Sequence, residues 1–198
     1  MRAFTLVEVL TTISIMGVIM VAVSLFQYNV INYNRSGAVA ITNTQEVQAL
    51  LKTMAKEIRS MESGADGAYP ISAGATTSLT FFADIDGDSL REKVRYYLAT
   101  TSVYRGVIKA TGSPAVYNAA NETRKMLISG VRNATSSPMF EYYDSMYAGT
   151  TTAMTYPLNL TSIRLVKISL TIDTDPSRSP VLRVFSTQVG LRNLKDNL

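Results

Sequence analysis

The sequence predicts an α+β protein in which one long N-terminal helix precedes, and packs on, a head of antiparallel β-sheet. Three observations predict this fold class. An apolar stretch opens the chain at residues 4–26, and apolar residues then recur at the helical period as far as Met61. After Pro70 the chain changes to short β-branched and aromatic segments separated by turn residues.

The first apolar stretch has the length of a membrane span. It reads FTLVEVLTTISIMGVIMVAVSLF and contains one charged residue, Glu8. As a helix rising 1.5 Å per residue it would extend roughly 35 Å, enough to cross a bilayer. Arg2 precedes it and the next basic residue is Arg35, so the positive-inside rule places the N-terminus in the cytoplasm and the head outside. We expect a transmembrane segment at residues 4–28.

Two simpler explanations of the apolar stretch remain open. It could be a secretory signal cleaved near Ala22-Val23-Ser24, or an ordinary signal anchor. Neither explains Glu8, because an ionised carboxylate in hydrocarbon costs several kcal/mol unless it is paired. Glu8 could also be a helix-surface residue whose side chain reaches towards the lipid headgroups.

The helix is predicted to continue beyond the membrane as an amphipathic half at residues 29–62. Its end is marked by Gly64, Gly67 and Pro70, since Gly favours a C-cap and Pro does not continue a helix. We therefore expect one helix from residue 5 to about residue 61. Its apolar stripe has the 3.6-residue period, with charged residues elsewhere on the wheel; the stripe consists of Val47, Leu50, Leu51, Met54, Ile58 and Met61.

The remaining residues, 63–198, are predicted to form the β-rich head. Six segments have the composition of strands: 78–84, 93–99, 103–109, 140–144, 163–174 and 181–189. The last two are separated by a loop at residues 175–180, which contains two prolines. Residues 110–120 and 144–157 are rich in small polar residues, so we expect long surface loops there.

The composition argues against several classes of function. The chain has no Cys and no His, which excludes disulfides and thiolate zinc sites and removes the usual general base. No nucleophile and base constellation and no phosphate-binding loop is visible, so we expect no enzyme, no catalytic residue and no cofactor. The net charge of +4 is spread among acidic residues, and we expect no nucleic-acid partner.

One acidic loop allows two interpretations. Asp84, Asp86 and Asp88 alternate around a Gly, as in the opening of calcium loops. The match fails at the twelfth position, Arg95, and at Ser89, which replaces the glycine of the sharp turn. A plain hairpin turn explains the same residues, and we expect no metal. Glycosylation acceptor patterns occur at Asn34, Asn121, Asn133 and Asn159, and chance explains these too.

The N-terminus carries the most specific pattern of the chain. MRAFTLVEVL, with a short basic leader, a small residue, Phe, and Glu four residues later, resembles the processing site of type IV pilins and pseudopilins. The resemblance implies the pilin fold, cleavage by prepilin peptidase between Ala3 and Phe4, and N-methylation of Phe4. Residues 1–3 would be the leader peptide. Two departures are Ala3, where the family usually has Gly, and the lack of a helix-interrupting Pro.

The resemblance also implies a function and partners. In this family the carboxylate at the position of Glu8 pairs with the amine of a neighbouring subunit and sets its register. Segments such as FFADIDGDSLREKVRYYL are similar to minor pseudopilins of the J type. The implied role is a minor filament subunit, acting in initiation or at the tip, first in the cytoplasmic membrane and then in an extracytoplasmic filament. Its partners would be other pilin subunits, the prepilin peptidase and the inner-membrane assembly platform. A major subunit, or a membrane-anchored adhesin or binding domain, is the alternative.

Overall fold

The computed structural model describes residues 5–173 and 182–191, with side chains omitted from description at residues 31–43. The chain divides into two units, Met1–Thr42 and Asn43–Leu198. One helix, α1 (Leu6–Arg59), runs from the first unit into the second. The prediction of a single helix ending near Met61 is therefore confirmed to within two residues. Met61 itself forms an isolated bridge with Ala83.

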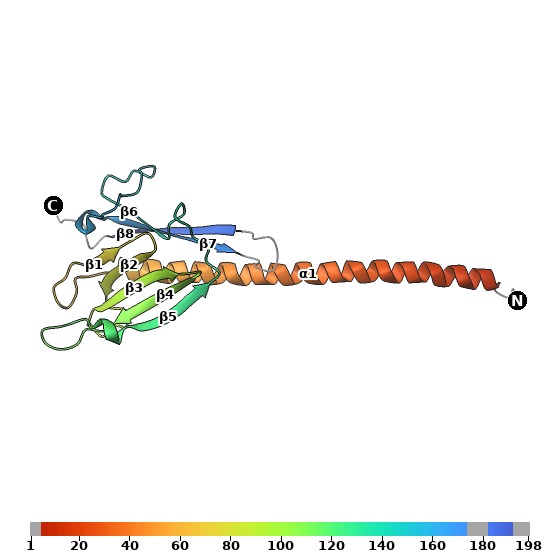
Figure 1. Ribbon diagram of the computed structural model, residues 1–198, viewed down its shortest axis with the longest axis horizontal. Helices are drawn as coiled ribbons and strands as arrows, with labels where there is room; N and C mark the ends of the chain where they lie inside the picture. The colour runs from red at the N-terminus through yellow and green to blue at the C-terminus, as the bar shows by residue number, and fades with distance from the viewer. Residues whose placement is uncertain (1–4, 174–181, 192–198) are drawn as a thin grey trace. The chain divides into compact units, whose positions relative to one another are not determined.

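The second unit contains a five-stranded antiparallel sheet. Its strand order follows the chain, so each strand pairs with the next one through a hairpin connection (Figure 1). The strands are β1 (Ile71–Gly74), β2 (Ser78–Ala83), β3 (Glu92–Ala99), β4 (Ser102–Ile108) and β5 (Thr123–Ser129). In β2 all residues after Ser78 are buried, whereas in β3 buried and half-buried residues alternate from Glu92 to Tyr96. Strands that cover a core show such patterns.

A second sheet of three antiparallel strands completes the unit, in the order β6, β7, β8. The strands are β6 (Phe140–Tyr143), β7 (Leu165–Asp173) and β8 (Leu182–Gly190). Two short 3₁₀ helices, η1 (Ala119–Asn121) and η2 (Leu160–Ser162), lie in the connections. The fold class is thus α+β, as predicted.

The strand prediction was incomplete at two places. β1 and β5 were not predicted, although the other six strands lie within two residues of their expected bounds. β5 begins with four exposed residues, so its sequence has no apolar alternation that would predict a strand. The segment is a strand because it pairs with β4. The loop expected at residues 144–157 contains no helix or strand. The loop expected at residues 110–120 contains no strand, but its last two residues belong to the 3₁₀ helix η1. The loop predicted at residues 175–180 lies outside the described residues.

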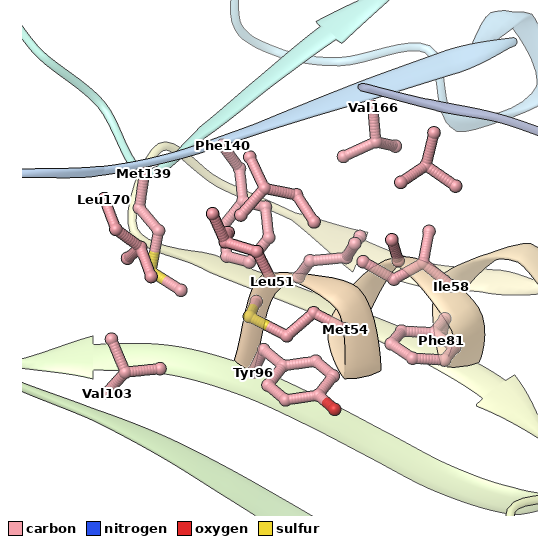
Figure 2. Packing of buried hydrophobic residues seen from close by; sticks show 14 of the residues in the cluster. Leu51, Met54, Ile58, Phe81, Tyr96, Val103, Met139, Phe140, Val166 and Leu170 are labelled. Carbon is pink, nitrogen blue, oxygen red and sulfur yellow. The ribbon is translucent and has the colours of Figure 1, made fainter. Parts of the chain in front are cut away.

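The core of the second unit lies between the two sheets, around the last turns of α1. Figure 2 shows Leu51, Met54 and Ile58 of the helix among side chains from both sheets. Phe81 and Tyr96 come from the larger sheet, and Phe140, Val166 and Leu170 from the smaller one. The predicted stripe is confirmed, because five of its six residues are buried and Leu50 packs against the cluster. This core holds the head together through the hydrophobic effect.

The carboxylate of Glu57 links α1 to the larger sheet by a hydrogen bond and an ion pair. Glu57 accepts a hydrogen bond from the Tyr96 hydroxyl at 2.6 Å, and its other oxygen lies 2.8 Å from Nη2 of Arg105. Burial, followed by the charge of Glu57, raises the pKa of Tyr96, so the hydroxyl stays protonated and donates. The Glu57 and Arg105 side chains are only 13% and 23% exposed, so their attraction is weakly screened by water.

We expect Glu57→Leu to lower the free energy of unfolding of the head by about 2–3 kcal/mol, because it leaves the Arg105 charge and the Tyr96 hydroxyl without their acceptor. Urea unfolding of the detergent-solubilised chain, followed by near-UV circular dichroism, measures this. Glu46→Leu is the matched control, since Glu46 is exposed on the same helix, and it should change stability by less than about 0.5 kcal/mol. Equal effects of the two variants would contradict the anchoring role.

Candidate assembly segment and acidic loop

The N-terminal part of α1, in the first unit, is an apolar helix whose side chains are exposed. Leu6–Val30 has 25 residues and a mean hydropathy of 2.4, so it is long and apolar enough to span a membrane. None of this segment is buried. Large apolar side chains are exposed on every side of the helix; among them are Leu6, Val7, Leu10, Ile13, Met16, Val18, Met20, Leu25 and Phe26.

Such a surface requires a covering. A monomeric soluble protein rarely exposes a contiguous apolar area of this kind, and each Å² left in water costs about 25 cal/mol. Lipid chains or other apolar helices are the two surroundings that remove this cost. The hydroxyls in the segment are compatible with both, because Thr11 and Ser14 donate to carbonyls one turn earlier, at 3.0 and 2.8 Å.

Glu8 lies in the first turn of this helix and takes part in a capping box. Its Oε2 accepts from the Thr5 backbone N–H and from the Thr5 hydroxyl, both at 3.2 Å. In return the Glu8 N–H donates to the Thr5 hydroxyl oxygen at 3.3 Å. This reciprocal pattern satisfies N–H groups that have no partner inside the helix, and the positive end of the helix dipole favours the carboxylate.

Thr5 is the partner that the sequence-based reasoning missed. The signal was present, because Thr followed three residues later by Glu before an apolar run is the pattern of a capping box. The Glu8 carboxylate can accept the two bonds from Thr5 and would still have room for a donor from a neighbouring subunit, because a carboxylate has about four acceptor positions. The predicted processing residues, Ala3 and Phe4, lie outside the described residues.

No protein-family model matches the chain, and no curated protein matches it. The likeness to pilins therefore rests on the N-terminal residues and on the form of the helix and head, and it is developed below as a proposal.

The acidic loop lies between β2 and β3, at residues 84–91. The two strands pair antiparallel, with Ala83 opposite Glu92, so the hairpin is confirmed. Carboxylate oxygens of Asp84, Asp86 and Asp88 all lie within 4.8 Å of one another. The aspartates also shape the loop: Asp84 accepts from Gly87 N–H at 2.7 Å and from Ser89 N–H at 3.0 Å.

Two charged residues from outside the loop contact it, and neither was singled out in the sequence. Glu92, the first residue of β3, accepts from the Ile85 N–H at 3.1 Å. Lys109 follows β4 and forms an ion pair with Asp86, with a longer contact of 3.7 Å to Asp88. Glu92 stands at a regular spacing from Asp84 and could have been found, whereas the approach of Lys109 depends on the pairing of β3 with β4.

The side chain of one glycosylation acceptor pattern, that of Asn133, is hydrogen-bonded within the head. The Asn133 side-chain nitrogen donates to the carbonyls of Ser137 and Ser169, both at 2.9 Å, and its oxygen accepts from the Thr171 N–H. A glycan on this nitrogen would remove these hydrogen bonds, which disfavours modification at Asn133. The side chain of Asn34 lies outside the described part of the chain.

Proposed function

We propose that this protein is a structural subunit of an extracytoplasmic filament, a minor pilin or pseudopilin whose N-terminal helix is first a membrane anchor and then the assembly rod. The observation that carries the proposal is the apolar helix of Leu6–Val30, of which nothing is buried and which has a carboxylate in its first turn. A helix of this kind can exchange lipid for the helices of neighbouring subunits at little cost, because both surroundings are apolar.

The head supports this role because it does not need the exposed segment. Its core is formed from helix residues beginning at Val47 and from the two sheets. The apolar surface of the first unit is therefore available to other molecules. A plain anchor also needs such a surface and could use Glu8 to cap its helix. Pairing with a neighbouring amine would in addition offset the cost of an ionised group in lipid.

The N-terminal pattern specifies the family within this proposal. Cleavage between Ala3 and Phe4 would free an amine close to Glu8 along the helix axis, and stacking of subunits would bring an amine to each carboxylate. The subunit would be single-pass in the cytoplasmic membrane, with the N-terminus in the cytoplasm, before extraction into a pseudopilus or type IV pilus-like filament. We favour a place at the tip or in initiation over that of the major subunit, on the likeness of the head sequence to minor pseudopilins.

Processing is the direct test of this function. Co-expression with an active prepilin peptidase should remove Met1-Arg2-Ala3 and leave N-methylated Phe4, which mass spectrometry of the intact chain and of its N-terminal peptide measures. The control is the same co-expression with an inactivated peptidase, which should leave the leader in place. If Ala3 slows cleavage, Ala3→Gly should increase the rate, and an unchanged rate would show that Ala is adequate.

Two other outcomes of the processing experiment would contradict the proposed function. A membrane-bound chain that keeps Met1 beside an active peptidase would indicate an anchored adhesin or binding domain. A chain shortened after Ser24 and released from the membrane would indicate an ordinary secretory signal.

A further inference from the structure

The last strand, β8, forms a free edge of the smaller sheet. It pairs with β7 alone, in a continuous register from Leu182 to Gly190 without a bulge. Proteins usually protect a free edge by short length, bulges, proline or charged side chains, because unpaired backbone groups attract another strand. β8 has nine residues, no proline and one charged side chain, that of Arg183. It is therefore an edge that another extended segment can join.

The hydrogen bonds of β7 show which residues of β8 present their backbone groups at this edge. Leu191 N–H donates to the Arg164 carbonyl, and these residues are the next opposed pair after Leu165 and Gly190. In an antiparallel ladder, hydrogen-bonded and non-hydrogen-bonded pairs alternate. Alternate residues therefore turn their N–H and C=O groups away from β7; they include Leu182, Val184, Ser186 and Gln188. These groups form no backbone hydrogen bond within the part of the chain that the structure describes.

A basic groove lies beside the middle of this edge, between β8 and α1. It has a volume of about 540 Å³. Ser186 and Thr187 line it from β8, and Lys52, Lys56 and Arg59 are the charged residues that line it from α1. The lining contains no acidic residue. A negatively charged group that enters the groove would meet three cations and no carboxylate.

None of these three cations has a carboxylate partner among the described residues, unlike six other basic residues of the head. Those six form ion pairs; they are Arg91, Arg95, Arg105, Lys109, Arg124 and Lys167. Lys52, Lys56 and Arg59 share one face of α1, since steps of four and three residues return to the same side of a helix. Like charges at these spacings repel one another, and a bound acidic group would relieve the repulsion.

The same charges decide which occupant fits the groove. A second copy that paired its own β8 with this edge would bring a strand whose single charged residue is Arg183, together with the cations of its own groove. Positive groups would then face positive groups, which disfavours that pairing. An apolar strand would leave the three cations without counter-ions. An extended acidic segment supplies both backbone partners for β8 and carboxylates for the groove.

The length of the basic stripe fits acidic residues at alternate positions of such a segment. Side chains on the same face of a strand are two residues, or about 6.6 Å, apart. Lys52 and Arg59 are seven residues apart on α1, which corresponds to about 10.5 Å along the helix axis. Two or three alternate carboxylates therefore extend over the same length as the three cations.

We propose that the free edge of β8 and the basic groove beside it form a docking site for an extended acidic segment of another protein. The segment adds to the smaller sheet as a fourth strand, and its carboxylates are directed to Lys52, Lys56 and Arg59. The site is formed entirely by the head, so it does not depend on the proposed role in a filament.

Binding of a labelled synthetic peptide to the full chain in uncharged detergent tests the site. The probe is a peptide of alternating Glu and Thr, about eight residues long, which is a common strand length. The control peptide has Lys in place of Glu. Fluorescence anisotropy should show saturable binding of the Glu peptide that weakens as salt is added, and at least about 10-fold weaker binding of the Lys peptide. Equal binding of the two peptides, or no binding of the Glu peptide at about 1 mM, would overturn the proposal.

A substitution in β8 tests the addition of a strand. Ser186→Pro removes an N–H that points away from β7, so it leaves the pairing of β7 with β8 intact, as proline does on edge strands. It should weaken binding of the Glu peptide about 3–10-fold. Ser186→Ala is the control and should bind like the unchanged protein, because it keeps the N–H. Unchanged binding by Ser186→Pro would exclude strand addition and overturn the proposal.

Substitutions on α1 test the cations. Lys56→Glu should weaken binding about 3–10-fold, and the combination of Lys52→Glu and Lys56→Glu at least about 10-fold. The matched control is Lys125→Glu, since Lys125 is an exposed lysine on β5, at the free edge of the larger sheet and outside the groove. It should bind like the unchanged protein.

Two results of these measurements contradict the acidic occupant. If the groove variants bind the Glu peptide as Lys125→Glu does, the cations do not recognise it. If the chain instead self-associates in analytical ultracentrifugation, and Ser186→Pro abolishes this association while the Glu peptide does not compete with it, the edge belongs to a second copy of the chain.

Discussion

Met54→Asp should unfold the head. Met54 is fully buried between the two sheets, in contact with the cluster that includes Tyr96 and Phe140 (Figure 2). The substitution removes a large apolar side chain, which by itself costs about 2–5 kcal/mol, and it places a carboxylate in an apolar environment without a partner. The total is comparable with the whole stability of a domain, about 5–15 kcal/mol.

The neighbouring residue provides the control for this change. Thr53 is exposed on the same turn of α1, so Thr53→Asp adds the same charge to the same helix without entering the core. It should leave the unfolding transition within about 0.5 kcal/mol of the original. Near-UV circular dichroism and urea unfolding in detergent measure both variants. A cooperative transition retained by Met54→Asp would show that the helix stripe is not the centre of the core.

Glu8→Leu should lower incorporation into filaments while leaving membrane insertion intact. One carboxylate costs only about 3 kcal/mol on insertion scales, a small amount against the many aliphatic residues of Leu6–Val30. Without it, the methylated amine of the adjacent subunit would be buried unpaired, at a cost on the order of 3–5 kcal/mol. At a tip position, where one side has no neighbour, the defect should be milder than in a major subunit.

The capping box supplies the variant that separates two roles of Glu8. Thr5→Ala removes the hydroxyl that bonds to Glu8 and costs the helix about 1 kcal/mol, but it leaves the carboxylate in place. If Glu8 acts by pairing with a neighbour, Thr5→Ala should assemble nearly normally and Glu8→Leu should assemble less. If Glu8 only caps the helix, the two variants should have similar, mild effects.

Cross-linking to filament partners, together with membrane fractionation, measures these outcomes. Glu8→Asp is a useful third variant, because it keeps the charge and shortens the side chain, so partial incorporation would support the pairing. Cross-linking of Glu8→Leu at the level of the unchanged protein would rule the pairing out, and loss of the variant from the membrane would show that Glu8 acts earlier, in insertion or stability.

The sequence by itself determined the features that repeat over short distances. The apolar run of α1, the stripe from Val47 to Met61 and the strands β2, β3, β4 and β7 all follow from local periodicity, since burial of one face imposes a period of 3.6 or 2 on the residues. The capping box of Thr5 and Glu8 is local as well, and it was available to a closer reading of the first turn.

Only the tertiary structure decided the features that join distant residues. β5 has no apolar pattern because its first residues are exposed, and it is a strand because β4 supplies its hydrogen bonds. The pairing of Glu57 with Arg105 depends on how α1 packs on the larger sheet. The burial of Glu92 and the approach of Lys109 to Asp86 depend on the register between strands. Charged side chains carry no period that reveals their partner, so these contacts exist only once the sheets are assembled.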